Sequence, residues 1–229
     1  MKTLFLSAYF SGVAKRFPDF AGGAVTGKKV AFIPTASRPE KVTFYVDADK
    51  KTLAKLGFSI RELEISSASA PEIEEGLETA DYIFVEGGNT FFLLQELKRT
   101  GADKAILRQI DQGKPYIGAS AGSMILAPSI EYAQRMDDAA AAPRLNGDFS
   151  ALAAVDFCVV PHFTNAPFRK AAQQIVAEYA QRLDLRSISN HEAIVVRGNR
   201  VETLAAPVRQ RKKCAQANIS ESQRKENAA

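Results

Sequence analysis

Short apolar runs alternate with amphipathic stretches along the first two thirds of the chain, and this alternation most restricts the fold. The runs are apolar at nearly every position rather than at every second one; they occupy residues 3–7, 29–33, 58–65, 82–85 and 116–117. A strand that is apolar on both sides must be covered on both faces, as in a parallel sheet flanked by helices. The alternation therefore predicts a doubly wound α/β domain with a mostly parallel sheet.

Helix signals separate these runs. Segment 38–56 ends at Gly57 and segment 89–99 ends near Gly101, and glycine is the preferred residue just beyond a helix C-terminus. Residues 193–197 and 200–205 flank a Gly-Asn pair and predict a β-hairpin. After Pro167, apolar side chains recur at steps of three and four, which predicts a helix buried along one stripe. The stripe consists of Phe168, Ala172, Ile175, Tyr179 and Leu183.

Composition excludes several classes of protein. Of 229 residues, 46% are apolar and 24% are charged, which is typical of a globular chain and not of a disordered or fibrous one. The apolar runs are too short to span a membrane, and the opening residues lack a signal-peptide cleavage pattern. We predict a cytoplasmic protein with one domain over residues 1–205, monomeric or homodimeric, with no membrane partner.

The net charge of +4 comes from one end of the chain. Residues 206–229 contain six Lys and Arg but only two Asp and Glu, so this segment carries the whole excess. We predict a basic, flexible C-terminal tail and no nucleic-acid partner; a nucleic-acid-binding arm is the alternative. Cys158 is expected in the core and Cys214 in the tail. The two cysteines and two histidines show no metal-ligand spacing, so no metal or cofactor is predicted.

The sequence Gly118-Ala-Ser120-Ala-Gly122 follows a predicted strand and precedes an apolar stretch able to start a helix. Small residues around a serine permit the tight strand-to-helix turn that exposes a nucleophilic hydroxyl. The amide of Ala121 is then a candidate donor to an oxyanion. The alternative is a glycine-rich turn whose serines only cap the helix.

A second turn, Glu86-Gly-Gly88-Asn89-Thr, also lies between a strand and a helix. Paired glycines allow backbone amides to approach a ligand closely, and Gly88 is the candidate for a second oxyanion donor. We predict that Asn89 binds substrate. A phosphate cradle is the rival interpretation, although no Gly-Lys-Ser/Thr ending is present. Asn89 or the threonine after it is also suited to cap the helix.

His162 follows the apolar run 157–160 and is the candidate base for Ser120, because a serine hydroxyl needs a neighbouring base to become nucleophilic. Glu192 is the preferred carboxylate partner of His162, with Asp137 or Asp138 as alternatives and His191 as a competing base. If residues 189–193 are extended, His191 and Glu192 point in opposite directions. Asn165 is a further candidate for substrate binding.

Taken together, the GGNT turn, the sequence GASAGSM with Pro128 after it, and the sequence Pro-His-Phe-Thr-Asn resemble peptidase family S51. This family includes the α-aspartyl dipeptidases (dipeptidase E) and, more distantly, cyanophycinases. The resemblance covers about residues 1–205. It implies a three-layer α/β/α, flavodoxin-like fold of the class I glutamine amidotransferase type, with Ser120 in place of that fold's cysteine. It also implies Ser120 as nucleophile, His162 as base and a carboxylate at Glu192.

The chain departs from the aspartyl dipeptidases at two places. Where they carry an aspartate proposed as the triad partner, direct counting finds Arg135, with Asp137 and Asp138 nearby. Their longer charged segment after the histidine is replaced by a few residues that lead into a helix, in which Arg169 and Lys170 are the available cations. The resemblance therefore implies a serine hydrolase of small peptides with a weak preference for N-terminal aspartate. A non-catalytic or differently specific binding protein of the same fold is the alternative.

Overall fold

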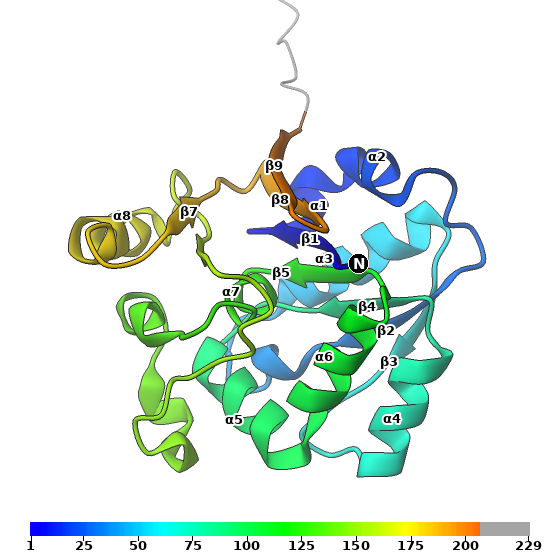
Figure 1. Cartoon of the computed structure of the whole chain (residues 1–229), viewed down its shortest axis with the longest axis horizontal. Coiled ribbons are helices and arrows are strands. Elements are labelled where there is room, and N and C mark those ends of the chain that lie inside the picture. Colours follow the sequence, from blue (N-terminus) through cyan, green and yellow to red (C-terminus); the bar gives the residue numbers. More distant parts are fainter. Residues whose placement is uncertain (207–229) are drawn as a thin grey trace, which may run out of the picture.

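A seven-stranded sheet forms the centre of the computed structural model, which describes residues 1–206 (Figure 1). Its strands are β1 (Thr3–Ser7), β2 (Lys29–Ile33), β3 (Ser59–Glu62), β4 (Tyr82–Val85), β5 (Tyr116–Ala119), β8 (Glu192–Arg197) and β9 (Arg200–Ala205). Their spatial order is β3-β2-β4-β5-β1-β8-β9. The first five are mutually parallel, whereas β8 runs antiparallel to β1 and pairs with β9. The mostly parallel sheet and the C-terminal hairpin are thus confirmed.

Both faces of the sheet are buried, which explains the continuous apolar runs. Along β1, Leu4 and Leu6 belong to one hydrophobic cluster and Phe5, between them, belongs to the other. Successive side chains of a strand point to opposite faces, so an apolar run supplies both cores at once. The first cluster packs under α4 (Ala70–Thr79), α5 (Thr90–Thr100), α6 (Ala102–Asp111) and α7 (Ala121–Met124). The second lies under α1 (Phe10–Val13), α2 (Phe17–Ala21) and α3 (Phe44–Leu56). Figure 1 shows these helical layers on the two sides of the sheet.

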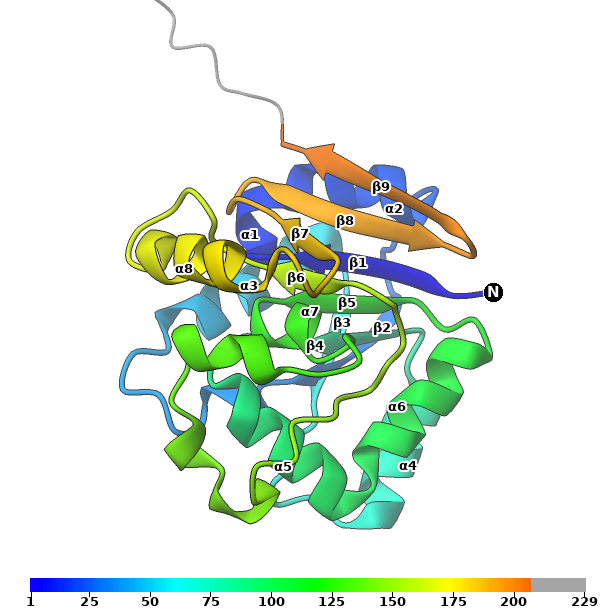
Figure 2. The same ribbon diagram turned by 60° about the vertical axis from the view of Figure 1, so that its left-hand side comes forward.

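A second, two-stranded sheet holds the segment before His162. β6 (Cys158–Val160) pairs in parallel with β7 (Leu185–Ser187), and α8 (Arg169–Tyr179) connects them. The predicted strand before His162 exists, but it does not join the central sheet, because β8 occupies the free edge of β1. Figure 2 shows this small unit beside the carboxyl ends of β5 and β1, where it contacts α7.

The local predictions differ from the structure in two places. The predicted helix over 38–56 begins only at Phe44. Residues 38–43 form a loop instead, in which Val42 is exposed and is not part of the hydrophobic core. On α8 the stripe is buried at Ala172, Ile175 and Tyr179, but Phe168 is 38% exposed.

Short 3₁₀ segments complete the fold: η1 (Ala14–Arg16), η2 (Thr35–Ser37), η3 (Glu131–Arg135), η4 (Ala139–Ala141) and η5 (Pro143–Leu145).

Cys158 is buried, as predicted, and burial raises the pKa of its thiol to about 11. Cys214 and the predicted basic tail lie outside the described residues, apart from Ala206. Within residues 1–206, no helix is both long and apolar enough to span a membrane.

Candidate active site

Ser120 lies at a sharp turn between β5 and α7. Its backbone has φ 45° and ψ −106°. Residues other than glycine rarely adopt this conformation, which is strained. The flanking glycines make this turn possible. A Cβ at Gly118 would lie 2.6 Å from the carbonyl oxygen of Gly122, and a Cβ at Gly122 would overlap the carbonyl oxygen of Val85. The Ser120 amide donates to the carbonyl of Ser7 at 2.9 Å, which fixes the turn against β1.

His162 faces Ser120 from the end of β6. The distance from Ser120 Oγ to His162 Nε2 is 3.0 Å. His162 also has a positive φ, 60°, so both partners of this contact adopt strained backbone conformations. The ring of Phe168 packs over the imidazole with centroids 5.0 Å apart. Burial lowers the pKa of His162, which keeps the imidazole neutral and able to accept a proton near neutral pH.

Asn190 occupies the other side of the imidazole. Its Oδ1 lies 2.6 Å from His162 Nδ1. Because an amide oxygen only accepts, Nδ1 carries the hydrogen and Nε2 is free to accept from the Ser120 hydroxyl. Asn165 holds this partner in place: its Oδ1 accepts from the Asn190 amide at 2.8 Å, and its own amide donates to the His162 carbonyl at 2.9 Å. The side chain of Asn165 therefore holds the backbone of Asn190, and its main-chain N–H supports the turn at His162.

The expected contact between Glu192 and His162 is absent, and this corrects the sequence-based assignment of the partner. Glu192 begins β8, and its Oε2 accepts from the Ser189 amide at 2.7 Å. In an extended segment the side chains would alternate between two directions, but the chain turns at residues 190–191, so this alternation does not apply there. His191 is exposed, and its Nδ1 lies 3.3 Å from the carbonyl oxygen of Gly12 rather than near Ser120.

The GGNT turn is built as a rigid start of α5. Asn89 is its N-cap: Oδ1 accepts from the Phe92 amide, and Nδ2 donates to the Asp138 carbonyl, both at 2.9 Å. Both ends of the Asn89 side chain are thus engaged within the protein, and only 4% of the residue is exposed. Gly88 has φ 136°, and a Cβ there would overlap the carbonyl of Ala36.

The two alternative aspartates dock on α5 and not on His162. Asp137 Oδ2 accepts from the amide of Thr90 at 2.9 Å and also contacts the Thr90 hydroxyl. Burial raises the pKa of Asp137 to about 6, although the Thr90 hydrogen bonds lower it. The Asp138 side chain accepts from the Ala140 amide. The Asp137 carboxylate and the main-chain carbonyl of Asp138, which accepts from Asn89 Nδ2, fasten the loop after α7 to the GGNT turn.

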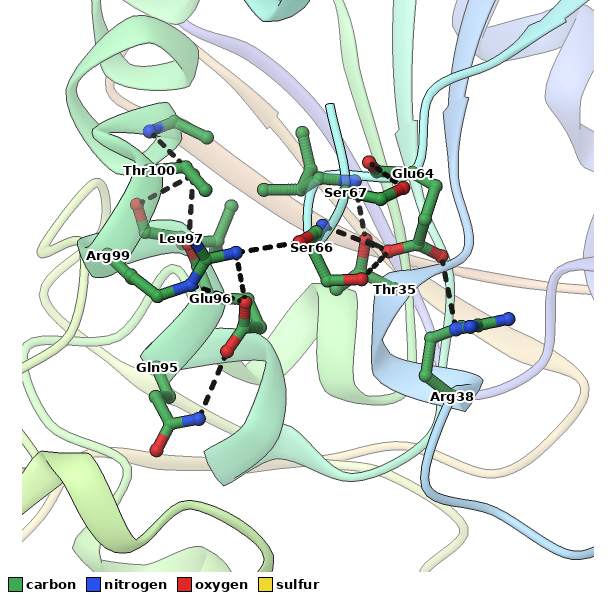
Figure 3. Close-up of polar contacts among 12 residues, drawn as sticks. Thr35, Arg38, Glu64, Ser66, Ser67, Gln95, Glu96, Leu97, Arg99 and Thr100 are labelled. Atoms are coloured by element: carbon green, nitrogen blue, oxygen red, sulfur yellow. Dashed lines mark hydrogen bonds and ion pairs between the residues drawn. The ribbon is translucent and has the colours of Figure 1, made fainter. Parts of the chain in front are cut away.

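A polar network behind this turn supports it from the side of β2 and β3 (Figure 3). The hydroxyl of Thr35 donates to Glu64 at 2.8 Å and accepts from the Ile65 amide at 3.1 Å. Thr35 begins η2, whose Ala36 carbonyl accepts from the Asn89 amide at 2.8 Å. On α5, Arg99 bonds Glu96 at 2.8 Å and the Ser66 carbonyl at 2.7 Å, joining the helix to the same loop.

A groove of about 500 Å³ lies on the outer side of α5, but none of the residues described above around Ser120 lines it. Its lining consists of Ser66, Phe92, Gln95, Glu96, Arg99, Pro143 and Arg144. Within residues 1–206, no group of three or more His, Cys, Asp or Glu side chains is arranged to hold a metal ion.

The chain is similar to known proteins over nearly all of its described length. The model of peptidase family S51 matches residues 3–204. The chain is 52% identical over 206 residues to an uncharacterized peptidase of Listeria innocua, covering 90% of this chain and 98% of that one. It is 31% identical over 159 residues to Peptidase E of a Nostoc species, covering 69% of this chain and 61% of that protein.

Among solved structures, it is similar to one from Listeria monocytogenes provisionally named Peptidase E. The TM-score is 0.86 at 50% identity, covering 90% of this chain and all of that one. The chain belongs to peptidase family S51, and its enzymatic class is that of a peptidase.

Proposed function

We propose that this protein is a cytoplasmic serine peptidase of small peptides in which Ser120 is the nucleophile, His162 the base and Asn190 the residue that orients the base. The observation that carries the proposal is the 3.0 Å contact between Ser120 Oγ and His162 Nε2 at a strained strand-to-helix turn. A serine that only capped α7 would have no need of an imidazole aligned on its hydroxyl.

In this mechanism the neutral Nε2 of His162 accepts the proton of Ser120 as Oγ attacks the peptide carbonyl. The imidazolium then protonates the leaving amine, and an acyl-enzyme forms. Water, deprotonated by the same nitrogen, releases the acid and restores the hydroxyl. Asn190 Oδ1 keeps the hydrogen on Nδ1 through both halves of the cycle, which holds Nε2 toward Ser120.

Two backbone amides are available for the oxyanion. Ala121 follows the nucleophile at the first position of α7, and Gly88 belongs to the turn that packs beside Ser120. Among the hydrogen bonds of residues 1–206, none uses the N–H of Ala121 or of Gly88. Free, rigidly held amides beside a nucleophile are suited to stabilise a tetrahedral intermediate.

The proposal predicts that Ser120→Ala lowers kcat by roughly 10³–10⁶-fold and leaves the thermal melting curve close to that of the unmodified chain. Reaction with a fluorophosphonate, followed by peptide mapping, is expected to place the adduct on Ser120. An unchanged kcat for the alanine variant, on a substrate that the unmodified protein cleaves, would refute the mechanism.

We propose short peptides without a strict requirement for N-terminal aspartate as substrates. The segment between His162 and α8 is brief and contains no cation. Arg169 and Lys170, at the start of α8, are exposed, and Arg169 donates to the Thr164 carbonyl at 3.1 Å. No cation is therefore fixed beside the nucleophile by this segment. In a panel of X-Leu dipeptides with Asp, Asn, Ala and Leu at X, we expect kcat/KM for Asp within about tenfold of the others, that is within about 1.4 kcal/mol. Cleavage confined to Asp-Leu would contradict this.

A further inference from the structure

Glu86, the residue between β4 and the paired glycines, has a carboxylate that the mechanism above does not use. It is 1% exposed. Its Oε1 accepts from the Gly87 amide at 2.7 Å, whereas its Oε2 is buried and has no hydrogen-bond partner among residues 1–206. A buried charged oxygen without a partner is costly, so this arrangement needs a physical reason.

A second buried acid, Asp49, lies on helix α3. Asp49 of α3 is fully buried; its Oδ1 accepts from the amide of Ser11 at 2.9 Å and contacts the Ser11 hydroxyl. Its Oδ2, like Oε2 of Glu86 and the hydroxyl of Tyr45 on the same helix, has no partner within the described part of the chain. Three buried polar atoms without a hydrogen-bond partner among residues 1–206 thus come from Glu86, just before the Gly87–Gly88 turn, and from Asp49 and Tyr45 of α3.

The titratable and charged groups that act on this region are four acids, two phenols and one lysine: Glu86, Asp49, Glu40, Asp137, Tyr9, Tyr45 and Lys50. Burial and then the charge of Asp49 raise the pKa of Glu86 well above its ordinary value, against the Gly87 hydrogen bond and Lys50. Burial raises the pKa of Asp49 to about 6, although its hydrogen bonds with Ser11 and Phe10 lower it.

Two phenols respond to the same acids. The pKa of Tyr9 is raised by burial, Asp49 and Glu86. The pKa of Tyr45 is raised by burial, Glu86, Glu40 and Asp137. Lys50 also pairs with Glu62.

The turn that Glu86 holds is in contact with the nucleophile. A Cβ added at Gly87 would lie 3.1 Å from Cβ of Ser120, and Gly88 next to it has the left-handed φ of 136°. When the Gly87 N–H is fixed on Oε1, the orientation of the following peptide, whose N–H belongs to Gly88, is restricted. An oxyanion donor is effective only when it is held in place before the reaction.

We propose that Glu86 is a positioning residue that fixes the Gly88 amide for the oxyanion, and that Glu86 and Asp49 together retain one proton in the active enzyme. The first part rests on the proposed function, since it needs an acyl transfer at Ser120. The second part rests on burial and on the charge of Asp49 that acts on Glu86. Both carboxylates are buried, each has one oxygen without a hydrogen-bond partner among residues 1–206, and no Lys or Arg of that range forms an ion pair with either, so ionising both at once is unfavourable.

The test compares Glu86→Ala, which removes the acceptor, with Glu86→Gln, which keeps an amide oxygen but cannot ionise. Glu62→Gln, on the exposed side of Lys50, is the matched control. Three readouts are needed: kcat and KM on a cleaved dipeptide, the rate of fluorophosphonate labelling at Ser120, and thermal melts between pH 5 and pH 8.

We expect Glu86→Ala to lower kcat and the labelling rate by about 10- to 100-fold, with KM changed less than threefold, as for a weakened oxyanion donor. Glu86→Gln is expected to restore most of that rate. Its Tm relative to the unmodified chain is expected to rise with pH. The folded unmodified chain keeps a carboxyl proton that its unfolded chain releases, so the unmodified chain loses stability as pH rises, and the Gln variant lacks this group. Glu62→Gln is expected to show neither effect.

The proposal is overturned if folded Glu86→Ala keeps its kcat, if Glu86→Gln is as slow as Glu86→Ala, or if the Tm difference of Glu86→Gln does not change with pH. Should Glu86→Ala fail to fold, Glu86→Gln and the pH series still decide it. Failure of the proposed function looks different: the unmodified protein would then not be labelled at Ser120, while the melts would still report on the shared proton.

Discussion

At the scale of single residues, the neutral partner of His162 sets the chemistry of the base. An amide oxygen orients the imidazole as a carboxylate would, but it adds no full negative charge to stabilise the imidazolium. Burial lowers the pKa of His162, and the Asn190 hydrogen bond only partly offsets this. The site therefore favours a base that stays neutral over a base that is strongly basic.

Asn190→Asp tests this arrangement. A carboxylate at Nδ1 stabilises the protonated ring, so the pKa of His162 rises and the acidic limb of kcat/KM is expected to move to higher pH by about one unit or more. Asn190→Ala removes the orientation and is expected to lower kcat by about 100-fold. The measurement is a pH profile of kcat/KM for each variant.

Glu192→Gln is the control for this prediction. Gln keeps an acceptor for the Ser189 amide, so we expect kcat to stay within a fewfold of the unmodified protein. If Glu192→Gln were far slower than Asn190→Ala, the carboxylate that the sequence favoured would be the functional partner after all, and the arrangement around His162 described above would not be the reactive one.

At the scale of elements, the short helix α1 positions the turn that carries Asn190, although it contributes no side chain to the reaction. A Cβ at Gly12 would overlap the carbonyl oxygen of Asn190. The helix can approach the turn only because residue 12 has no side chain. The same element carries Ser11, which holds Asp49 of α3, so α1 connects the histidine partner with the buried acids.

Gly12→Ala is expected to displace the Asn190 turn and to reduce kcat by about tenfold or more, with a smaller change in KM. Gly76→Ala on α4 is the matched helical control. There the nearest atoms belong to the flexible end of the Leu63 side chain, and alanine favours the helix by about 1 kcal/mol. Equal kcat values for the two variants would show that α1 does not position Asn190.

At the scale of the whole molecule, buried acids make stability depend on pH. The folded pKa of Asp137, about 6, lies above its unfolded value of 3.8. The folded chain therefore binds more protons than the unfolded chain between these values, and the stability that this provides below about pH 4 is lost as pH rises through about 6. His162 acts in the opposite sense, because its pKa is lowered.

Asp137→Asn is expected to melt at a higher temperature than the unmodified chain at pH 8 and to lose this advantage toward pH 4. The difference in unfolding free energy approaches about 3 kcal/mol at most. Asparagine still accepts from Thr90, so kcat is expected to stay within a fewfold. A Tm difference that is the same at every pH would show that Asp137 does not ionise in the folded protein.

The features of the fold that depend on local chemistry could be predicted from the sequence. Runs apolar on both sides, as in Leu4-Phe5-Leu6, require a sheet covered on both faces, and this gave the α/β architecture. Gly118 and Gly122 around Ser120 predicted the tight turn, and Asn89 with Gly101 marked the limits of α5. In each case a pattern within a few residues restricts the backbone directly.

Which polar side chain contacts His162 could not be predicted in this way. Asn190, His191 and Glu192 are adjacent in sequence, and nothing local distinguishes them as partners. The choice depends on Gly12, which lies far away in sequence and lets α1 pack against the carbonyl of residue 190. It depends equally on Asn165, which holds the amide of that residue. Contacts between distant segments fix orientations that local propensity leaves open, because several side-chain placements cost nearly the same until the packing selects one.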